Sequence, residues 1–166
     1  MRLPRAKYTR LSAMLVATGV ASLAAPAAAD NWTYMDNRSS PQTLVESYYA
    51  AISQQSYAQA YGYFAEGSAP KEFEAWVKGY ADTGAVKVKF GETAPDPGAG
   101  QIYWALPVAI SASKKDGTSE TFTGCYKIHM TNPGMQTDPP YQPMGIVSAT
   151  LRKSGASFES ASPGPC

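Results

Sequence analysis

The chain has 166 residues, with 14 Lys and Arg against 13 Asp and Glu, one His and two Cys. Its length suits a single domain with a sizeable core. One His and two distant Cys argue against a metal site, which needs three or four converging ligands, so we expect neither a metal nor a cofactor.

An export leader is indicated at the N-terminus. An uncharged stretch, residues 11–25, lies between four basic residues and three small residues that precede Asp30: the basic residues are Arg2, Arg5, Lys7 and Arg10, and the small ones Ala27, Ala28 and Ala29. This pattern is typical of a signal peptide, here 1–29. The apolar stretch is interrupted and shorter than the roughly 20 residues that a span needs, which favours cleavage over an uncleaved anchor. We therefore predict a periplasmic or secreted protein with no membrane span.

The charge of the mature chain differs from that of the whole chain. The leader holds four of the 14 basic residues and none of the 13 acidic ones, so the remaining 137 residues (166 − 29) carry 10 − 13 = −3. No basic stripe is present to attract phosphate backbones or anionic lipid headgroups. Nucleic acid is therefore not an expected partner.

Export places the two cysteines where a disulfide persists. Pairing of Cys125 with Cys166 would close a loop of about 40 residues, worth on the order of 4 kcal/mol of stability in the chain-entropy model. A redox-active thiol is the alternative, but redox pairs usually lie two residues apart beside a helix. We predict a structural disulfide that pins the tail, residues 161–166.

Three helices are predicted in the first half of the mature chain, after a flexible arm at 30–39. Ser40 and Pro41 begin the first helix, and the apolar stripe of Leu44, Tyr48 and Ile52 follows at helical spacing. A second stripe runs over 57–64, with Gly67 expected to end that helix. A third helix from about residue 70 carries an aromatic face and ends near 82–84; the face comprises Phe73, Trp76, Val77 and Tyr80.

The period then changes from 3.6 to 2, which predicts strands at 86–90, 102–111, 122–130 and 146–152, with Phe158 in a possible fifth. Asp116 and Gly117 indicate a hairpin between the second and third strands. Pro107 suggests an edge position or a bulge in the second strand. Segments 91–100 and 131–145, rich in Pro or Gly, are expected to be loops.

Helices followed by antiparallel strands predict an α+β fold. Three stretches carry a resemblance to the nuclear transport factor 2-like superfamily: the helical pair 48–64, the aromatic face 73–80 with Trp76 at its centre, and 122–126. The resemblance implies three N-terminal helices packed on a curved antiparallel sheet of four to five strands, a cystatin-like cone spanning 40–160. The chain looks like the small exported members of that superfamily in the Gram-negative envelope.

Aromatic side chains are expected to line the inside of such a cone. The candidate ligand pocket comprises Tyr48, Tyr61, Trp76, Tyr80, Trp104 and Tyr126. Rings of this kind could bind a small apolar, aromatic or sugar-like molecule, with phenol hydroxyls orienting it. The alternative is that the rings only fill the core.

Candidate catalytic residues are few. Superfamily enzymes resemble one another in placing an Asp, His or Tyr base inside the cone, and Asp82 or Glu92 with Tyr126 are the candidates here. Glu120 shares the core-facing parity of its strand but stands at a strand end. His129 alternates with the apolar positions of its strand, so we expect it on the outer sheet face, away from the pocket.

These observations favour an exported non-catalytic domain that binds a small apolar or aromatic ligand, or an envelope protein. Two alternatives stay open: a cofactor-free isomerase, dehydratase or hydrolase, and a cell-wall-associated accessory protein. The outer sheet face could form a homodimer; its small or weakly charged residues include Tyr103, Ala105, Ala109, Thr121, Thr123 and Lys127. The loop 131–145 could be a lid, a docking strip or an ordinary loop.

Overall fold

The structure, a computed structural model, describes residues 33–166. The predicted signal peptide 1–29 and the first residues of the predicted arm, 30–32, lie outside the described residues. In chain order the described elements are helices α1 (Pro41–Ser53), α2 (Tyr57–Tyr61) and α3 (Phe73–Lys78), strands β1 (Thr83–Phe90), β2 (Asp96–Gly98), β3 (Gln101–Lys114) and β4 (Ser119–Thr131), a short 3-10 helix (Pro133–Met135) and strand β5 (Gly145–Ser154). The predicted α+β architecture is confirmed.

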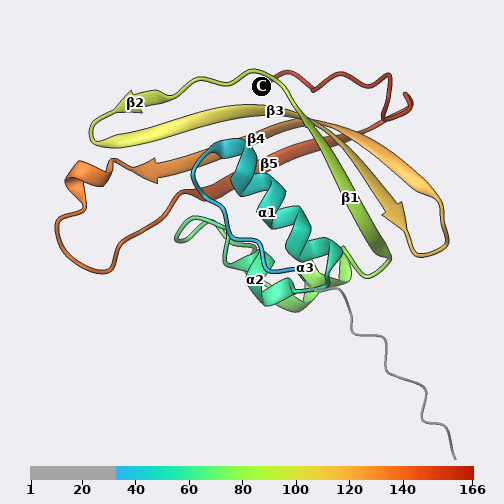
Figure 1. The fold of residues 1–166 in the computed structure, drawn as a ribbon, viewed down its shortest axis with the longest axis horizontal. Helices are drawn as coiled ribbons and strands as arrows, with labels where there is room; N and C mark the ends of the chain where they lie inside the picture. The colour runs from blue at the N-terminus through green and yellow to red at the C-terminus, as the bar shows by residue number, and fades with distance from the viewer. Residues whose placement is uncertain (1–32) are drawn as a thin grey trace, which may run out of the picture. The chain divides into compact units, whose positions relative to one another are not determined.

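The strands form one open antiparallel sheet in the order β1-β3-β4-β5, and β2 pairs with the start of β3. The helices lie on one side of the sheet, which bends over α1 (Figure 1). We call the side that faces α1 the inner face and the opposite side the outer face. The predicted hairpin joins β3 to β4, with Gly117 in the left-handed region at φ 85°. No helix among residues 33–166 is both long and apolar enough to cross a membrane.

Helix α1 begins at a reciprocal cap. Ser40 Oγ accepts a hydrogen bond from the Thr43 backbone N–H at 3.2 Å, and Thr43 Oγ1 accepts one from the Ser40 N–H at 3.1 Å. Pro41 occupies the first turn, where its missing N–H costs nothing. The buried side of the helix is broader than the sequence stripe, and comprises Pro41, Leu44, Val45, Ser47, Tyr48, Tyr49, Ala51 and Ile52. The helix therefore packs over a wide arc of its surface.

The described part of the predicted arm, 33–39, is hydrogen-bonded to the helices. The Asn37 N–H donates to the Oγ of the buried Ser47 at 2.9 Å. The buried Tyr63 hydroxyl donates to the Met35 carbonyl at 2.8 Å. These bonds give partners to two polar groups in the core, of which the Tyr63 hydroxyl also accepts from Gln59 Nε2 at 3.1 Å.

Helix α2 ends at Tyr61, so the expectation that it continues to Gly67 is wrong. The backbone beyond Gly62 instead pairs with the edge of β5: the Ala65 N–H donates to the Ile146 carbonyl at 2.9 Å, and the Ile146 N–H donates to the Tyr63 carbonyl at 2.8 Å. An unpaired strand edge presents backbone donors and acceptors. That edge pairs with 63–65 in an extended conformation, which a helix could not supply.

Helix α3 is held by its rings. It has only six residues and buries none of them completely, but Trp76 contacts five aromatic neighbours at ring-centroid distances of 5.3 to 6.3 Å, namely Tyr57, Tyr61, Phe64, Phe73 and Tyr80. Four of these contacts are edge-to-face, a favoured geometry for aromatic pairs. This aromatic cluster joins α2 and α3 into one layer.

The fifth strand is not where the sequence suggested. Phe158 lies in a turn, and the ammonium of Lys89 lies 4.6 Å from the centroid of its ring. The additional strand is instead β2, inside the segment predicted as a loop, 91–100. Pro107 lies on the interior strand β3, just past the last β1 partner, so it removes no ladder bond to β1.

The C-terminal tail lies against the outer face of β4. Cys166 and Cys125 form the predicted disulfide, with their Cα atoms 5.1 Å apart. The Gly164 N–H donates to the Val108 carbonyl at 3.1 Å, which brings the tail across two strands. Part of the face suggested for a homodimer is therefore occupied by the chain's own tail.

Gly124 on β4 lies where the backbone of β5 leaves no room for a side chain. A Cβ at Gly124 would overlap the carbonyl oxygen of Thr150 on β5, a backbone atom that cannot turn away. We expect Gly124→Ala to lower the free energy of unfolding by about 3 kcal/mol through overpacking, as measured by urea denaturation. Gly155→Ala is the matched control, because a Cβ there meets nothing within 4 Å. Equal stability of the two variants would contradict the close packing.

The disulfide gives a second test of the tail. Its sequence separation is 41 residues, and we expect reduction to lower the free energy of unfolding by about 4 kcal/mol through the larger entropy of the unfolded chain. Urea denaturation with and without reductant measures the difference. A Cys125→Ser, Cys166→Ser double variant should have the same free energy of unfolding as the reduced protein, and reductant should not change it. If the reduced protein were as stable as the oxidised one, the disulfide would not contribute to stability as predicted.

Candidate ligand-binding site

A cavity of about 340 Å³ lies between the helix layer and the inner sheet face, beside the β3–β4 hairpin. Five apolar side chains from the sheet line it: Val86, Ile110, Ala112, Phe122 and Leu151. Two phenols, Tyr49 of α1 and Tyr80 just after α3, line it from the helix side. The size is that of a small ligand pocket, and its walls are mostly apolar.

Each phenol of the cavity wall is hydrogen-bonded to another tyrosine. The Tyr49 and Tyr126 hydroxyl oxygens are 2.5 Å apart, and those of Tyr48 and Tyr80 are 2.7 Å apart. The first pair joins α1 to β4, and the second joins α1 to the end of the α3 segment. The two pairs therefore hold the three structural parts that surround the cavity.

Burial raises the pKa of all four phenols. Desolvation is the main cause in every case, because a phenolate would lose its hydration in the core. Neighbouring phenols add to the effect at Tyr48, Tyr49 and Tyr126. These hydroxyls therefore stay protonated and act as hydrogen-bond donors and acceptors rather than as bases.

Each tyrosine pair has one proton to spare. A pair contains two O–H groups, but only one of them can donate to the other phenol oxygen. The accepting phenol keeps its own proton for a further acceptor. Because Tyr49 and Tyr80 line the cavity, an acceptor atom on a ligand can accept a hydrogen bond from the remaining O–H group.

Charged side chains stand at the cavity mouth. Glu120 Oε1 accepts from Lys153 Nζ at 2.8 Å and from Lys114 Nζ at 3.0 Å, and these bonds lower the pKa of its carboxyl group. Asp82 is exposed at the same mouth, where its backbone carbonyl accepts from the Lys115 N–H at 3.0 Å. A general base in this cavity would need a desolvated carboxylate aimed at the ligand, whereas Asp82 is exposed and the partly buried Glu120 is held ionised by two lysines.

The six predicted pocket residues fall into three groups. Tyr80 lines the cavity, and Tyr48 and Tyr126 are the partners of its two phenol pairs. Tyr61 and Trp76 belong to the aromatic cluster of α2 and α3. Trp104 packs against the core from β3 and is not a lining residue of this cavity.

The candidate base Glu92 is exposed in the segment after β1 and does not line the cavity. Tyr49 does line it, although it is not among the residues predicted from the sequence. The sequence does contain a pattern that could have identified Tyr49, because Val45, Tyr49 and Ile52 recur at helical spacing beside the predicted stripe. The broad buried arc of α1 brings both stripes into the core.

His129 and Lys127 project to the outer face of β4. The residues that alternate with them, Tyr126 and Ile128, are buried in the core. Within residues 33–166, no group of three or more His, Cys, Asp or Glu side chains is placed to hold a metal ion. On the outer face His129 lines a second, larger hollow, separate from the inner cavity.

Comparisons with protein-family models, with curated proteins and with solved structures give no match. The function must therefore be argued from the geometry of the site.

The buried phenols make stability fall at alkaline pH. Their folded pKa values lie above the unfolded value of 10.0, so their contribution is complete below pH 10 and is lost as the pH rises beyond it. The urea midpoint measured across this range should fall. A Tyr49→Phe, Tyr126→Phe double variant removes both partners of one pair and should show a shallower fall. An identical pH dependence in the two proteins would contradict this origin.

Proposed function

We propose that this chain is an exported, non-catalytic binding domain of the nuclear transport factor 2-like, cone-shaped type, which holds a small apolar or aromatic ligand in the cavity between its helices and its sheet. The observation that carries the proposal is an apolar cavity of about 340 Å³ with two hydrogen-bonded phenol pairs in its wall. Apolar walls with a few placed polar groups are typical of small-molecule sites.

The chemistry of the wall defines the ligand class. The sheet side chains favour an apolar or aromatic body, and the spare phenol proton favours one acceptor, such as a ketone or ether oxygen. The paired carboxylate and lysines at the mouth stay in water. A ligand of the size of two fused aromatic rings with one carbonyl group matches both requirements.

Export is supported by the disulfide between Cys125 and Cys166, because such bonds persist in oxidising compartments. The leader pattern at 1–29 points to the same location. We therefore place the binding activity in the periplasm or outside the cell.

Binding is favoured over the isomerase, dehydratase or hydrolase alternative by the state of the ionisable groups. Such an enzyme needs a desolvated base aimed at its substrate. Asp82 is exposed, and the ionised Glu120 is paired with two lysines. The hydroxyl of Tyr126 is hydrogen-bonded to that of Tyr49. The cavity thus offers hydrogen bonds and apolar contact rather than proton abstraction.

The test uses prodan, a neutral naphthyl ketone whose emission depends on the polarity of its surroundings. We expect saturable binding with a blue-shifted emission. Ala112→Leu should weaken binding about tenfold, equal to about 1.4 kcal/mol, because the larger side chain fills part of the cavity. Fluorescence titration measures both affinities.

Ala105→Leu is the matched control, because Ala105 lies on the same strand but is exposed. It should bind prodan as the wild type does. Equal affinity in the Ala112→Leu variant, or no saturable binding in the wild type, would refute the proposal. Native mass spectrometry of the protein purified from the envelope fraction would then identify any small molecule that remains bound.

A further inference from the structure

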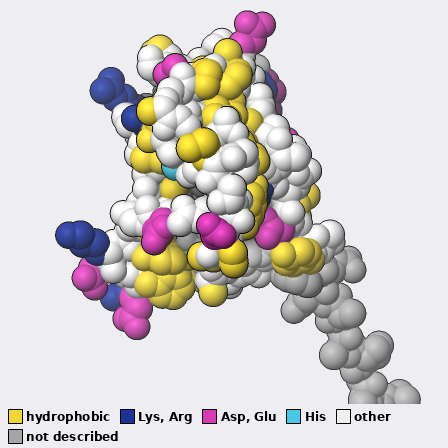
Figure 2. Space-filling model, turned by 90° about the vertical axis from the view of Figure 1, so that its left-hand side faces the viewer, with side chains coloured by type: hydrophobic (Ala, Val, Ile, Leu, Met, Phe, Trp, Pro, Cys, Tyr) yellow, Lys and Arg dark blue, Asp and Glu magenta, His cyan; other side chains and the backbone are white. Residues whose placement is uncertain are grey.

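A second hollow, of about 870 Å³, lies on the outer face, at the other end of the sheet from the hairpin. Three parts of the chain surround it: the start of β3 with the end of β4, the segment 62–68 beside β5, and the segment 140–143. Figure 2 looks onto this end of the molecule and shows hydrophobic side chains around the single histidine. We call this hollow the outer groove.

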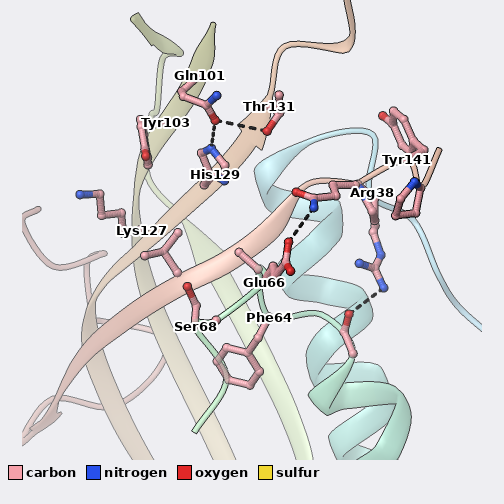
Figure 3. Close-up of a pocket in the computed structure, with 17 residues that line it drawn as sticks. Arg38, Phe64, Glu66, Ser68, Gln101, Tyr103, Lys127, His129, Thr131 and Tyr141 are labelled. Atoms are coloured by element: carbon pink, nitrogen blue, oxygen red, sulfur yellow. Dashed lines mark hydrogen bonds between the residues drawn. The ribbon is translucent and has the colours of Figure 1, made fainter. Parts of the chain in front are cut away.

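Two exposed tyrosines line the outer groove from opposite sides. Tyr103 on β3 is 36% exposed, and Tyr141 is 59% exposed. Figure 3 shows Tyr103 with His129 and Lys127 on the strands, across the groove from Tyr141 and Arg38. The Tyr103 ring already lies against the His129 ring, with centroids 4.8 Å apart, and under the Lys127 ammonium. The more exposed Tyr141 therefore offers the freer apolar face to a ligand.

The polar groups of the outer groove include both donors and acceptors. Gln101 Oε1 accepts from His129 Nε2 at 2.5 Å and from Thr131 Oγ1 at 3.2 Å, which leaves the Gln101 amide N–H groups to donate. Glu66 Oε2 accepts from Gln142 Nε2 at 2.6 Å, and its second oxygen remains an acceptor. A ligand here meets donors near the sheet and an acceptor near the 62–68 segment (Figure 3).

The groove wall formed by 140–143 is held in place before any ligand arrives. The Gln142 N–H donates to Gln136 Oε1 at 2.7 Å, and Gln136 Nε2 donates to the Gln142 carbonyl at 3.1 Å. The bond from Gln142 to Glu66 ties the same wall to the 62–68 segment. Because this wall is already ordered, less conformational entropy is lost when a ligand binds.

The cations of the groove are already engaged. The Arg38 guanidinium pairs with Asp36 at 3.0 Å, and it also donates to the Gly62 carbonyl at 3.1 Å. Lys127 Nζ lies 5.1 Å from the Tyr103 ring centroid. Glu66 adds a negative charge to the lining, and of the two cations only Lys127 has no carboxylate partner among residues 33–166. The lining therefore does not gather the several positive charges that favour a phosphate or sulfate group.

We propose that the outer groove binds a neutral saccharide of two or three sugar units. Each sugar hydroxyl both donates and accepts a hydrogen bond, which matches the mixed polar groups of Gln101, His129 and Glu66. The C–H faces of a pyranose ring carry partial positive charge and are attracted to the negative face of Tyr141, the more exposed of the two rings. A volume of about 870 Å³ accommodates a ligand of this length.

The experiment is an NMR titration of backbone amides with two probes, N,N′-diacetylchitobiose and maltotriose, and with inorganic phosphate for comparison. Saturable shifts of residues in 62–68, 101–103, 127–131 and 140–143 are expected with at least one saccharide. Chitobiose binding alone would indicate an N-acetylated envelope glycan, and maltotriose binding alone a glucan. Tyr141→Ala should weaken the affinity about fivefold to tenfold, since it removes one stacking face.

Two control variants test whether the saccharide occupies the outer groove and stacks on its ring. Tyr141→Phe keeps the ring and should retain most of the affinity, whereas Ala112→Leu alters only the inner cavity and should leave saccharide binding unchanged. The proposal is overturned if neither saccharide causes saturable shifts, if Tyr141→Ala binds as tightly as the wild type, or if phosphate alone perturbs these residues. Failure of prodan to bind the inner cavity would not affect this result.

Discussion

The packing of α1 against the inner face of the sheet is the contact on which the other parts of the structure depend. The helix buries residues over a broad arc, and it is the shared partner of the arm 33–39, of α2 and of β1. The Tyr49–Tyr126 bond then joins it to β4 in the interior. Such a buried polar pair is stable only when both hydroxyls are satisfied, so it defines where the helix must lie.

The inner cavity lies next to the end of α3, one of the two short helices of the layer. Helix α1 covers the middle of the sheet, but α2 and α3 have only five and six residues and are joined to it through rings. Edge-to-face rings pack well against one another but do not fill the space beside the hairpin. The phenol pairs join the parts of the chain that surround the cavity, α1 with β4 and α1 with the end of the α3 segment.

The two sheet faces have different partners. The inner face meets helices, whereas the outer face is divided between the C-terminal tail near Gly124 and the outer groove near Tyr103. The disulfide holds the tail over one half, and the Gln136 and Gln142 bonds hold the groove wall over the other. One small domain can thus present two hollows of different chemistry, the inner one walled mainly by apolar side chains and the outer one by a mixture of aromatic and polar side chains.

The sequence by itself determined the α+β order, the first helix from Ser40 and Pro41, the alternating strands and the pairing of Cys125 with Cys166, because these follow from local periodicity, caps and cysteine number. It could not determine the end of α2, the place of β2, or which tyrosines meet. Those depend on contacts between distant segments: the edge of β5 pairs with 63–65, and Tyr49 and Tyr126 are 77 residues apart. Only tertiary packing brings such groups together, because a local sequence pattern does not specify which distant residue a side chain will contact.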